Sequence, residues 1–137
     1  RALVEADVLT ICSGGGGIPV VAEDGQYVGV EAVNDKDFSA RVLAENVDAD
    51  RLIILTGVDN IYINYNQPDQ KALEQISVAE AEEYIKEGHF AAGSMLPKIE
   101  AALDFVKGDD KRKAIITSIE NLENIDKEAG TVISQKG

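Results

Sequence analysis

The segment NDKDFSARVLAENVDADRLIILTGV, residues 34–58, predicts a helix followed by a strand. Its first part places Phe38, Val42 and Leu43 at helical spacing behind Asn34, which we expect to cap the helix. Its second part, RLIILTGV, is a short run of apolar, β-branched residues, which is typical of a buried strand. Because helical crossovers connect parallel strands, the segment indicates an α/β domain with a mainly parallel sheet.

The residues before this segment predict a second buried strand and a hairpin. The run VLTICS, residues 8–13, is apolar and β-branched, and four glycines follow it. IPVVAEDGQYVGVEAV, residues 18–33, has Asp24-Gly25 between two β-prone pieces, which favours a hairpin. The opening residues RALVEAD predict the last turns of a helix that begins before them, and this suggests a fragment or a processed chain.

The residues after the segment continue the α/β pattern. Residues 59–77 predict a long connection that could bind a ligand. Ser77 and Glu80 predict a capped helix that ends at Gly88. A further helix is expected from residue 95, with Ile99, Leu103 and Val106 on its buried face. KAIITSI, residues 113–119, predicts a third buried strand, and GTVIS, residues 130–134, predicts a short edge or terminal strand.

Composition limits the function classes. The 137 residues suffice for one domain with a real core. Thirteen basic against 25 acidic residues give a net charge of -12, which argues against nucleic-acid binding. No apolar run is long enough to span a membrane, so a cytoplasmic location is expected. Cys12 is expected to be a buried hydrophobe, and no His, Cys and carboxylate spacing resembles a zinc site.

Two lysines occupy unusual positions. Lys36 and Lys98 each fall in the first turn of a predicted helix, where a cation typically costs about 0.3–1 kcal/mol compared with an acid. Two such ammonium groups at helix N-termini would suit a shared anion such as a phosphate. Asp35 and Asp37 bracket Lys36 and could hold its ammonium in place. The alternative is that both lysines are solvated surface residues.

The remaining candidate groups are less specific. The glycines Gly14, Gly15, Gly16 and Gly17 form neither a Walker loop nor a dinucleotide fingerprint, so they predict a backbone-lined cavity or a plain flexible turn. Tyr62 and Tyr65 could cover a purine or pack their own loop. His89, the single histidine, is more commonly a loop anchor than a catalyst, and no nucleophile triad forms around it.

Five stretches of the sequence together resemble the C-terminal half of the carbamate kinases in the amino acid kinase family. They are SGGGGIPV, GVEAVNDKDFSARVLAE, LIILTGVDNIYINYNQPDQ, HFAAGSMLPKIEAALDFV, and AIITSIENL with GTVIS. The likeness runs from about Leu9 to Ile133. Asn34 departs from it, since that family more often has an apolar residue there.

The resemblance implies a three-layer α/β/α sandwich with a mainly parallel sheet and the reversible reaction of ATP with carbamate to give ADP and carbamoyl phosphate. It implies catalytic roles for Lys36 and Lys98, which would bind the phosphoryl group, and for Asp37, which would orient them. The glycines at 14–17 would face carbamate. The nucleotide pocket would comprise Thr56, Gly57, Val58, Asp59, Tyr62 and Met95.

The resemblance also implies Mg²⁺ carried by the nucleotide, a homodimer, and an N-terminal half that these residues lack. Residues 1–137 would then be a single nucleotide-binding domain. We expect that domain alone to be poorly active or inactive. Two alternatives stay open. One is a related kinase for glutamate, acetylglutamate or a nucleoside monophosphate, and the other is a nucleotide-binding or assembly module without catalysis.

Overall fold

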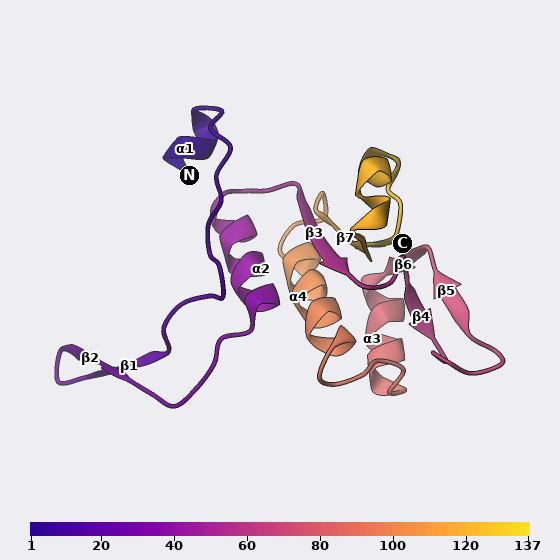
Figure 1. Ribbon diagram of the computed structural model, residues 1–137, viewed down its shortest axis with the longest axis horizontal. Helices are drawn as coiled ribbons and strands as arrows, with labels where there is room; N and C mark the ends of the chain where they lie inside the picture. The colour runs from indigo at the N-terminus through magenta and orange to yellow at the C-terminus, as the bar shows by residue number, and fades with distance from the viewer.

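The computed structural model describes residues 1–137, and Figure 1 shows the arrangement of the elements. No helix is long and apolar enough to cross a membrane. The elements in chain order are α1 (Ala2–Glu5), β1 (Val20–Glu23), β2 (Gln26–Gly29), α2 (Lys36–Asn46), β3 (Arg51–Thr56), β4 (Ile61–Ile63), β5 (Lys71–Leu73), β6 (Gln75–Ser77), α3 (Val78–Lys86), α4 (Met95–Lys107), β7 (Lys113–Ser118), the 3₁₀ helix η1 (Glu120–Lys127) and β8 (Thr131–Ser134).

The central sheet has four strands in the order β3-β7-β8-β6. β3 pairs with β7 and β6 pairs with β8 in parallel, whereas β7 and β8 are antiparallel. The prediction of an α/β fold with a mainly parallel sheet is therefore confirmed. The last predicted strand is confirmed as β8, the final element of the chain, but it is not at an edge, because it lies between β7 and β6 and its residues Thr131, Val132 and Ile133 are buried.

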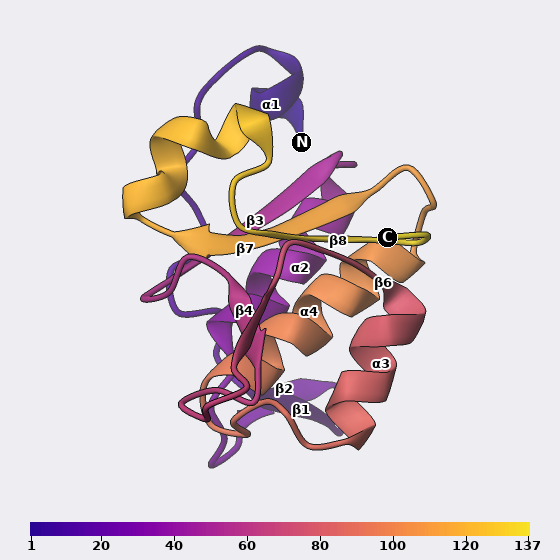
Figure 2. The ribbon, with the colours of Figure 1, turned by 90° about the vertical axis from the view of Figure 1, so that its right-hand side faces the viewer.

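Helices α2, α3 and α4 lie on one face of the sheet, and η1 lies on the other (Figure 2). The predicted face of α4 is confirmed, since Ile99, Leu103 and Val106 all enter the core. The second helical layer is thin, because η1 contacts β7 and leaves β3 uncovered. Ile53 and Leu55 of β3 consequently remain 39% and 38% exposed, although parallel strands are normally buried on both faces.

The helix starts follow capping chemistry with one correction. α2 is capped by Asp35, whose carboxylate accepts a hydrogen bond from the backbone N–H of Asp37 at 2.7 Å, and not by Asn34. In α3 the predicted capping box of Ser77 and Glu80 is present. Hydrogen bonds from the Ser77 backbone and hydroxyl lower the pKa of the Glu80 carboxyl.

The first 33 residues form an arm that differs from the prediction. The hairpin is confirmed as β1 and β2, but it projects away from the body (Figure 1). The buried strand predicted at residues 8–13 is wrong, because this run pairs with no other strand. Its side chains Leu9 and Ile11 are 95% and 101% exposed, and Cys12 is exposed rather than buried. An apolar run is buried only where the fold supplies a neighbouring strand and a covering layer.

The predicted long connection after β3 contains structure that the sequence reasoning missed. β4 and β5 form an antiparallel hairpin, and β6 follows directly. The buried hydroxyl of Thr131 accepts a hydrogen bond from the Ile61 N–H at 2.8 Å and donates to the Leu73 carbonyl. Since Ile61 and Leu73 are register partners, one side chain of the sheet holds both strands of the hairpin at their base.

The two faces of the sheet differ in packing, and this predicts different costs for two substitutions. Ile116→Ala removes a fully buried core side chain and should lower the free energy of unfolding by about 2–5 kcal/mol. Ile53→Ala, on the uncovered face of β3, should cost clearly less, because solvent already reaches that side chain. Urea unfolding of the protein measures both, and equal losses would contradict this assignment of the core.

Candidate functional site

The centre of the site is the carboxylate of Asp37, which is shared by two ammonium groups. Its Oδ2 lies 2.7 Å from the Nζ of Lys98 and 3.3 Å from the Nζ of Lys36. Asp37 is only 6% exposed, and the side chain of Lys98 is 13% exposed. Lys36, by contrast, has a side chain that is 64% exposed. The two lysines, 62 positions apart in the sequence, thus meet at one oxygen atom.

The topology explains this meeting. α2 leads into β3 and α4 leads into β7 through short connections, and β3 and β7 are parallel. Each helix runs opposite to the strand that follows it, so both helix N-termini lie at the carboxyl edge of the sheet. Open α/β sheets bind ligands at that edge. Lys36 is the first residue of α2, and Lys98 lies in the first turn of α4, which has no acid to balance it.

The electrostatics of the cluster favour charge on Lys36. The pKa of the Lys36 ammonium is raised by its contact with the neighbouring Lys98 side chain and by its hydrogen bond to the Asp37 carboxylate, whose charge favours the protonated form. Two ammonium groups next to one carboxylate leave an excess of positive charge beside two helix N-termini. Such an arrangement can bind a phosphate-like anion.

A cavity of about 620 Å³ opens beside Lys98. Of the predicted nucleotide-pocket residues, Thr56, Gly57, Val58, Tyr62 and Met95 line it together with Lys98. They come from the end of β3, from β4 and from the start of α4. A cavity of this size, lined by aromatic rings and closed at one point by an ammonium group, suits a ligand with a flat ring and a phosphate chain.

Asp59 was predicted in the same pocket but does not line this cavity. Its Oδ1 accepts a hydrogen bond from the buried Ser118 hydroxyl at 2.6 Å, and its carbonyl accepts one from Thr117. It lies instead in a smaller neighbouring hollow with Ser118 and Glu120. Asp59 therefore joins the loop after β3 to the carboxyl end of β7, which holds the cavity wall in place.

The glycine-rich loop lies outside the cavity, against the first turn of α2. Gly17 lines a separate hollow with Asn34, Phe38 and Ser39, and none of the four glycines lines the cavity beside Lys98. The carbonyl of Gly17 accepts a hydrogen bond from Nδ2 of Asn34 at 2.6 Å. The structure thus brings the loop to the N-terminus of α2, which carries Lys36.

Sequence reasoning missed about half of the cavity wall. Tyr65 lies 5.9 Å from Tyr62 between ring centroids, so the two tyrosines form a tilted pair from the β4–β5 hairpin. The turn residues of HFAAGS in front of α4 were a signal for backbone approaching a ligand, but no side-chain pattern pointed to them. Tyr65 had been named as a possible cover for a purine, and the lining residues not anticipated are Asn64, Gln67, Gly88, His89, Phe90, Ala91 and Ser94.

His89 contributes to the wall and not to the lysine cluster. Its Nε2 lies 3.0 Å from Oε2 of Glu87, and its ring meets the ring of Tyr84 edge to face at 5.7 Å. These contacts agree with the anchoring role expected for it. No three His, Cys, Asp or Glu side chains lie close enough together to hold a metal ion by themselves.

Comparisons with known proteins agree with this geometry. Residues 1–118 match the amino acid kinase family. The carbamate kinase of Latilactobacillus sakei and carbamate kinase 1 of Enterococcus faecium are each 56% identical to the chain over 97% of its length. The carbamate kinase of Giardia lamblia bound to AMP-PNP has a similar structure, with a TM-score of 0.89 and 42% identity over 98% of the chain.

The same comparisons show how much of each relative is matched. The chain spans 43% of the length of the two bacterial relatives and 47% of the Giardia lamblia chain. Residues 1–137 therefore correspond to a little under half of these proteins.

The burial of the Asp37–Lys98 pair predicts a large effect on stability. Asp37→Asn removes the charge that balances Lys98, and we expect a loss of about 3 kcal/mol in the free energy of unfolding. Glu82→Gln is the matched control, since it breaks an ion pair with Lys107 of similar length, 2.6 Å against 2.7 Å, whose partners are 42% and 43% exposed. It should cost much less, because solvent screens exposed pairs. Urea unfolding measures the free energy of unfolding of both variants, and similar decreases would contradict the structural role of Asp37.

Proposed function

Because the chain belongs to the amino acid kinase family, we propose that it is the nucleotide-binding, C-terminal part of a carbamate kinase, which transfers phosphate reversibly between ATP and carbamate. The observation that carries the proposal is the pair of ammonium groups on Asp37 beside the cavity. The high identity to curated carbamate kinases supports carbamate as the acceptor. The AMP-PNP bound to the Giardia lamblia enzyme supports an adenine nucleotide as the donor.

The chemistry asks for positioning and positive charge. The transferred phosphoryl group carries negative charge on three oxygens, and in-line transfer requires that its two partners be held in place. Lys98 would contact this group from the side of the cavity, and Lys36 would contact it from the start of α2. Asp37 would fix the distance between the two lysines by accepting from both. None of these three groups needs to gain or lose a proton during the transfer.

The nucleotide would occupy the cavity beside Lys98. Tyr62, Tyr65 and Met95, which line the cavity, would provide apolar surface for the base, and the polar atoms of Thr56 and Lys98 would contact the phosphates. Asp59 would act through its hydrogen bond to Ser118, as a support for the loop. Mg²⁺ would arrive with the nucleotide and neutralise part of the charge on its phosphates, since the chain offers no carboxylate cluster.

The glycine-rich loop would serve the acceptor. The loop contacts the N-terminus of α2 through Asn34, and none of its glycines lines the cavity beside Lys98. Carbamate between loop and lysines would then face the terminal phosphate of the nucleotide. A homodimer and a cytoplasmic location, as the resemblance and the composition imply, complete the proposal.

The reaction itself is tested in the reverse direction on the full-length protein. Incubation with ADP, Mg²⁺ and carbamoyl phosphate should form ATP, which a luciferase assay measures. Acetylglutamyl phosphate and glutamyl phosphate serve as controls for related kinases, and the quoted motifs predict that neither supports ATP formation. If carbamoyl phosphate yields no ATP above background, the proposed function is wrong. Binding of ADP without any turnover would instead favour a non-catalytic module.

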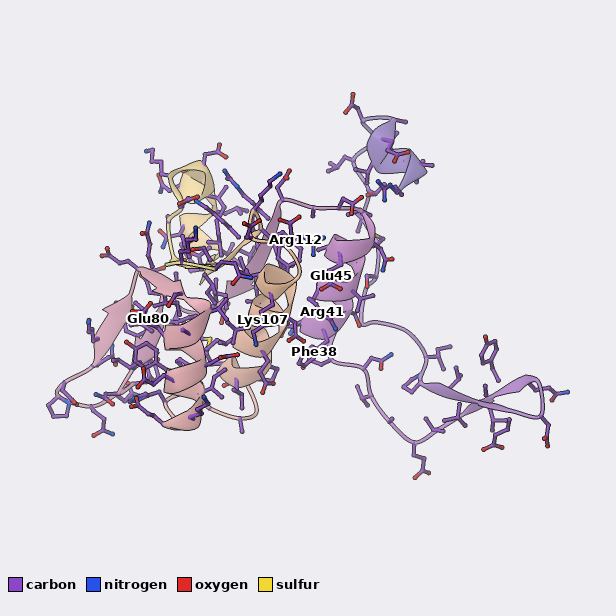
Figure 3. All side chains as sticks on the ribbon, turned by 180° about the vertical axis from the view of Figure 1, so that it is seen from behind. Phe38, Arg41, Glu45, Glu80, Lys107 and Arg112 are labelled. Atoms are coloured by element: carbon purple, nitrogen blue, oxygen red, sulfur yellow. The ribbon has the colours of Figure 1, made fainter.

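The role of Lys98 is tested by calorimetry with ADP. Lys98→Ala in the full-length protein should weaken ADP binding at least ~10-fold, because it removes a charge-assisted contact to phosphate. Lys107→Ala, on the same helix but outside the cavity, is the control and should bind normally (Figure 3). Equal affinities of the two variants would remove Lys98 from the nucleotide site.

Lys36 should affect the chemical step far more than stability. Its side chain is largely solvated, so Lys36→Ala should change the free energy of unfolding by less than about 1 kcal/mol. The loss of one cation from the transferring group should lower kcat on the order of 100-fold. If the fold-decrease in kcat is no larger than the fold-change in the KM for ADP, Lys36 has no role in the transfer.

A further inference from the structure

The N-terminal arm has two polar attachments to the remainder of the chain. Every other hydrogen bond and ion pair of residues 1–33 stays within the arm. One attachment is the ion pair of Arg1 with Asp48 at 2.6 Å, at the end of the arm remote from the lysines. The other is the hydrogen bond from Asn34 to the Gly17 carbonyl at 2.6 Å. At the lysine end, Asn34 is therefore the side chain that hydrogen-bonds the glycine-rich loop to the start of α2.

The packing of the loop explains why this side chain matters. Gly16 has φ = +99° and approaches α2 so closely that a Cβ atom there would lie 2.5 Å from Oγ of Ser39 and 3.1 Å from Cβ of Asn34. The loop is thus seated on the first turn of α2, but only van der Waals contact and the Asn34 amide keep it there. Its internal bond, from the Gly16 N–H to the Ser13 carbonyl at 2.7 Å, shapes the loop without attaching it.

Asn34 also lies next to the groups that would transfer the phosphate. It directly precedes Asp35, whose carboxylate caps α2 at the N–H of Asp37, and it stands two positions before Lys36. Its amide donates to Gly17 from the same turn of chain that sets the Lys36–Asp37–Lys98 cluster. We propose that Asn34 is a positioning residue that fixes the glycine-rich loop to the lysine cluster, so that the acceptor and the cations keep one geometry. This inference rests on the proposed function only for its kinetic consequence.

The direct test is hydrogen exchange of the loop amides in the full-length protein. Asn34→Leu keeps the size of the side chain but removes the donor, and exchange at the Gly16 N–H, which is bonded to the Ser13 carbonyl, should become about three- to tenfold faster. The matched control is Asn46→Leu, which removes the same kind of bond, from an amide Nδ2 to the Val42 carbonyl at 2.8 Å, from the far end of α2. It should leave the loop amides unchanged.

The kinetic test separates the two sides of the site. Asn34→Leu should raise the KM for carbamoyl phosphate by a similar factor of about three to ten, while the KM for ADP stays constant. Asn34→Gln keeps an amide donor on a longer stem and should restore part of the loss. A KM for ADP that rises equally would point to general disruption of the fold and would overturn the proposal.

The two possible failures give different results. Unchanged exchange at the loop in Asn34→Leu, or the same change in Asn46→Leu, overturns the positioning role of Asn34 whatever the enzyme does. If the unmutated protein forms no ATP from ADP and carbamoyl phosphate, the proposed function is overturned instead. The exchange measurement then still tests whether Asn34 holds the glycine-rich loop in place.

Discussion

The Asp37 carboxylate accepts from ammonium groups on two different helices, and the arrangement of the site follows from it. A lone lysine at the start of a helix is repelled by the positive end of the helix dipole, and two of them also repel each other. One nearly buried carboxylate between them offsets both effects and leaves a net positive charge. It also joins α2 to α4, since Lys98 on α4 donates a hydrogen bond to Asp37 on α2.

The sheet makes this contact possible. Because β3 and β7 are parallel neighbours and each follows its own helix, the N-termini of α2 and α4 are delivered side by side at the carboxyl edge. The cavity wall includes Lys98, and the glycine-rich loop contacts the turn that precedes Lys36. A site of this kind depends mainly on the distances between its charged groups.

Much of this arrangement could be predicted from the sequence, and the omissions have physical reasons. Helix α4 was predictable because Ile99, Leu103 and Val106 repeat at helical spacing and the helix ends at Gly108. The two lysines could be singled out by their cost at helix starts. That they share one oxygen of Asp37 could not, because the contact joins residues 61 positions apart through tertiary packing.

Burial was the weakest part of the sequence reasoning. Residues 8–12 have the composition of a core strand, yet Ile11 is fully exposed, because periodicity shows what a segment could bury and not whether a surface faces it. β8 was too short to place by pattern, and its central position depends on pairing with β7 and β6. Asn34 looked like a helix cap, but Asp35 takes that place and leaves the amide for Gly17.

The hydroxyl of Thr131, which binds both strands of the β4–β5 hairpin at their base, has a mechanical consequence. These two hydrogen bonds lie at the base of the hairpin, and the connection between its strands carries Tyr65 and Gln67, which line the cavity. Immobilising that turn over a guest molecule costs conformational entropy for a few residues only. The bases of β4 and β5 are already held by Thr131, so ordering them adds little to this entropic cost.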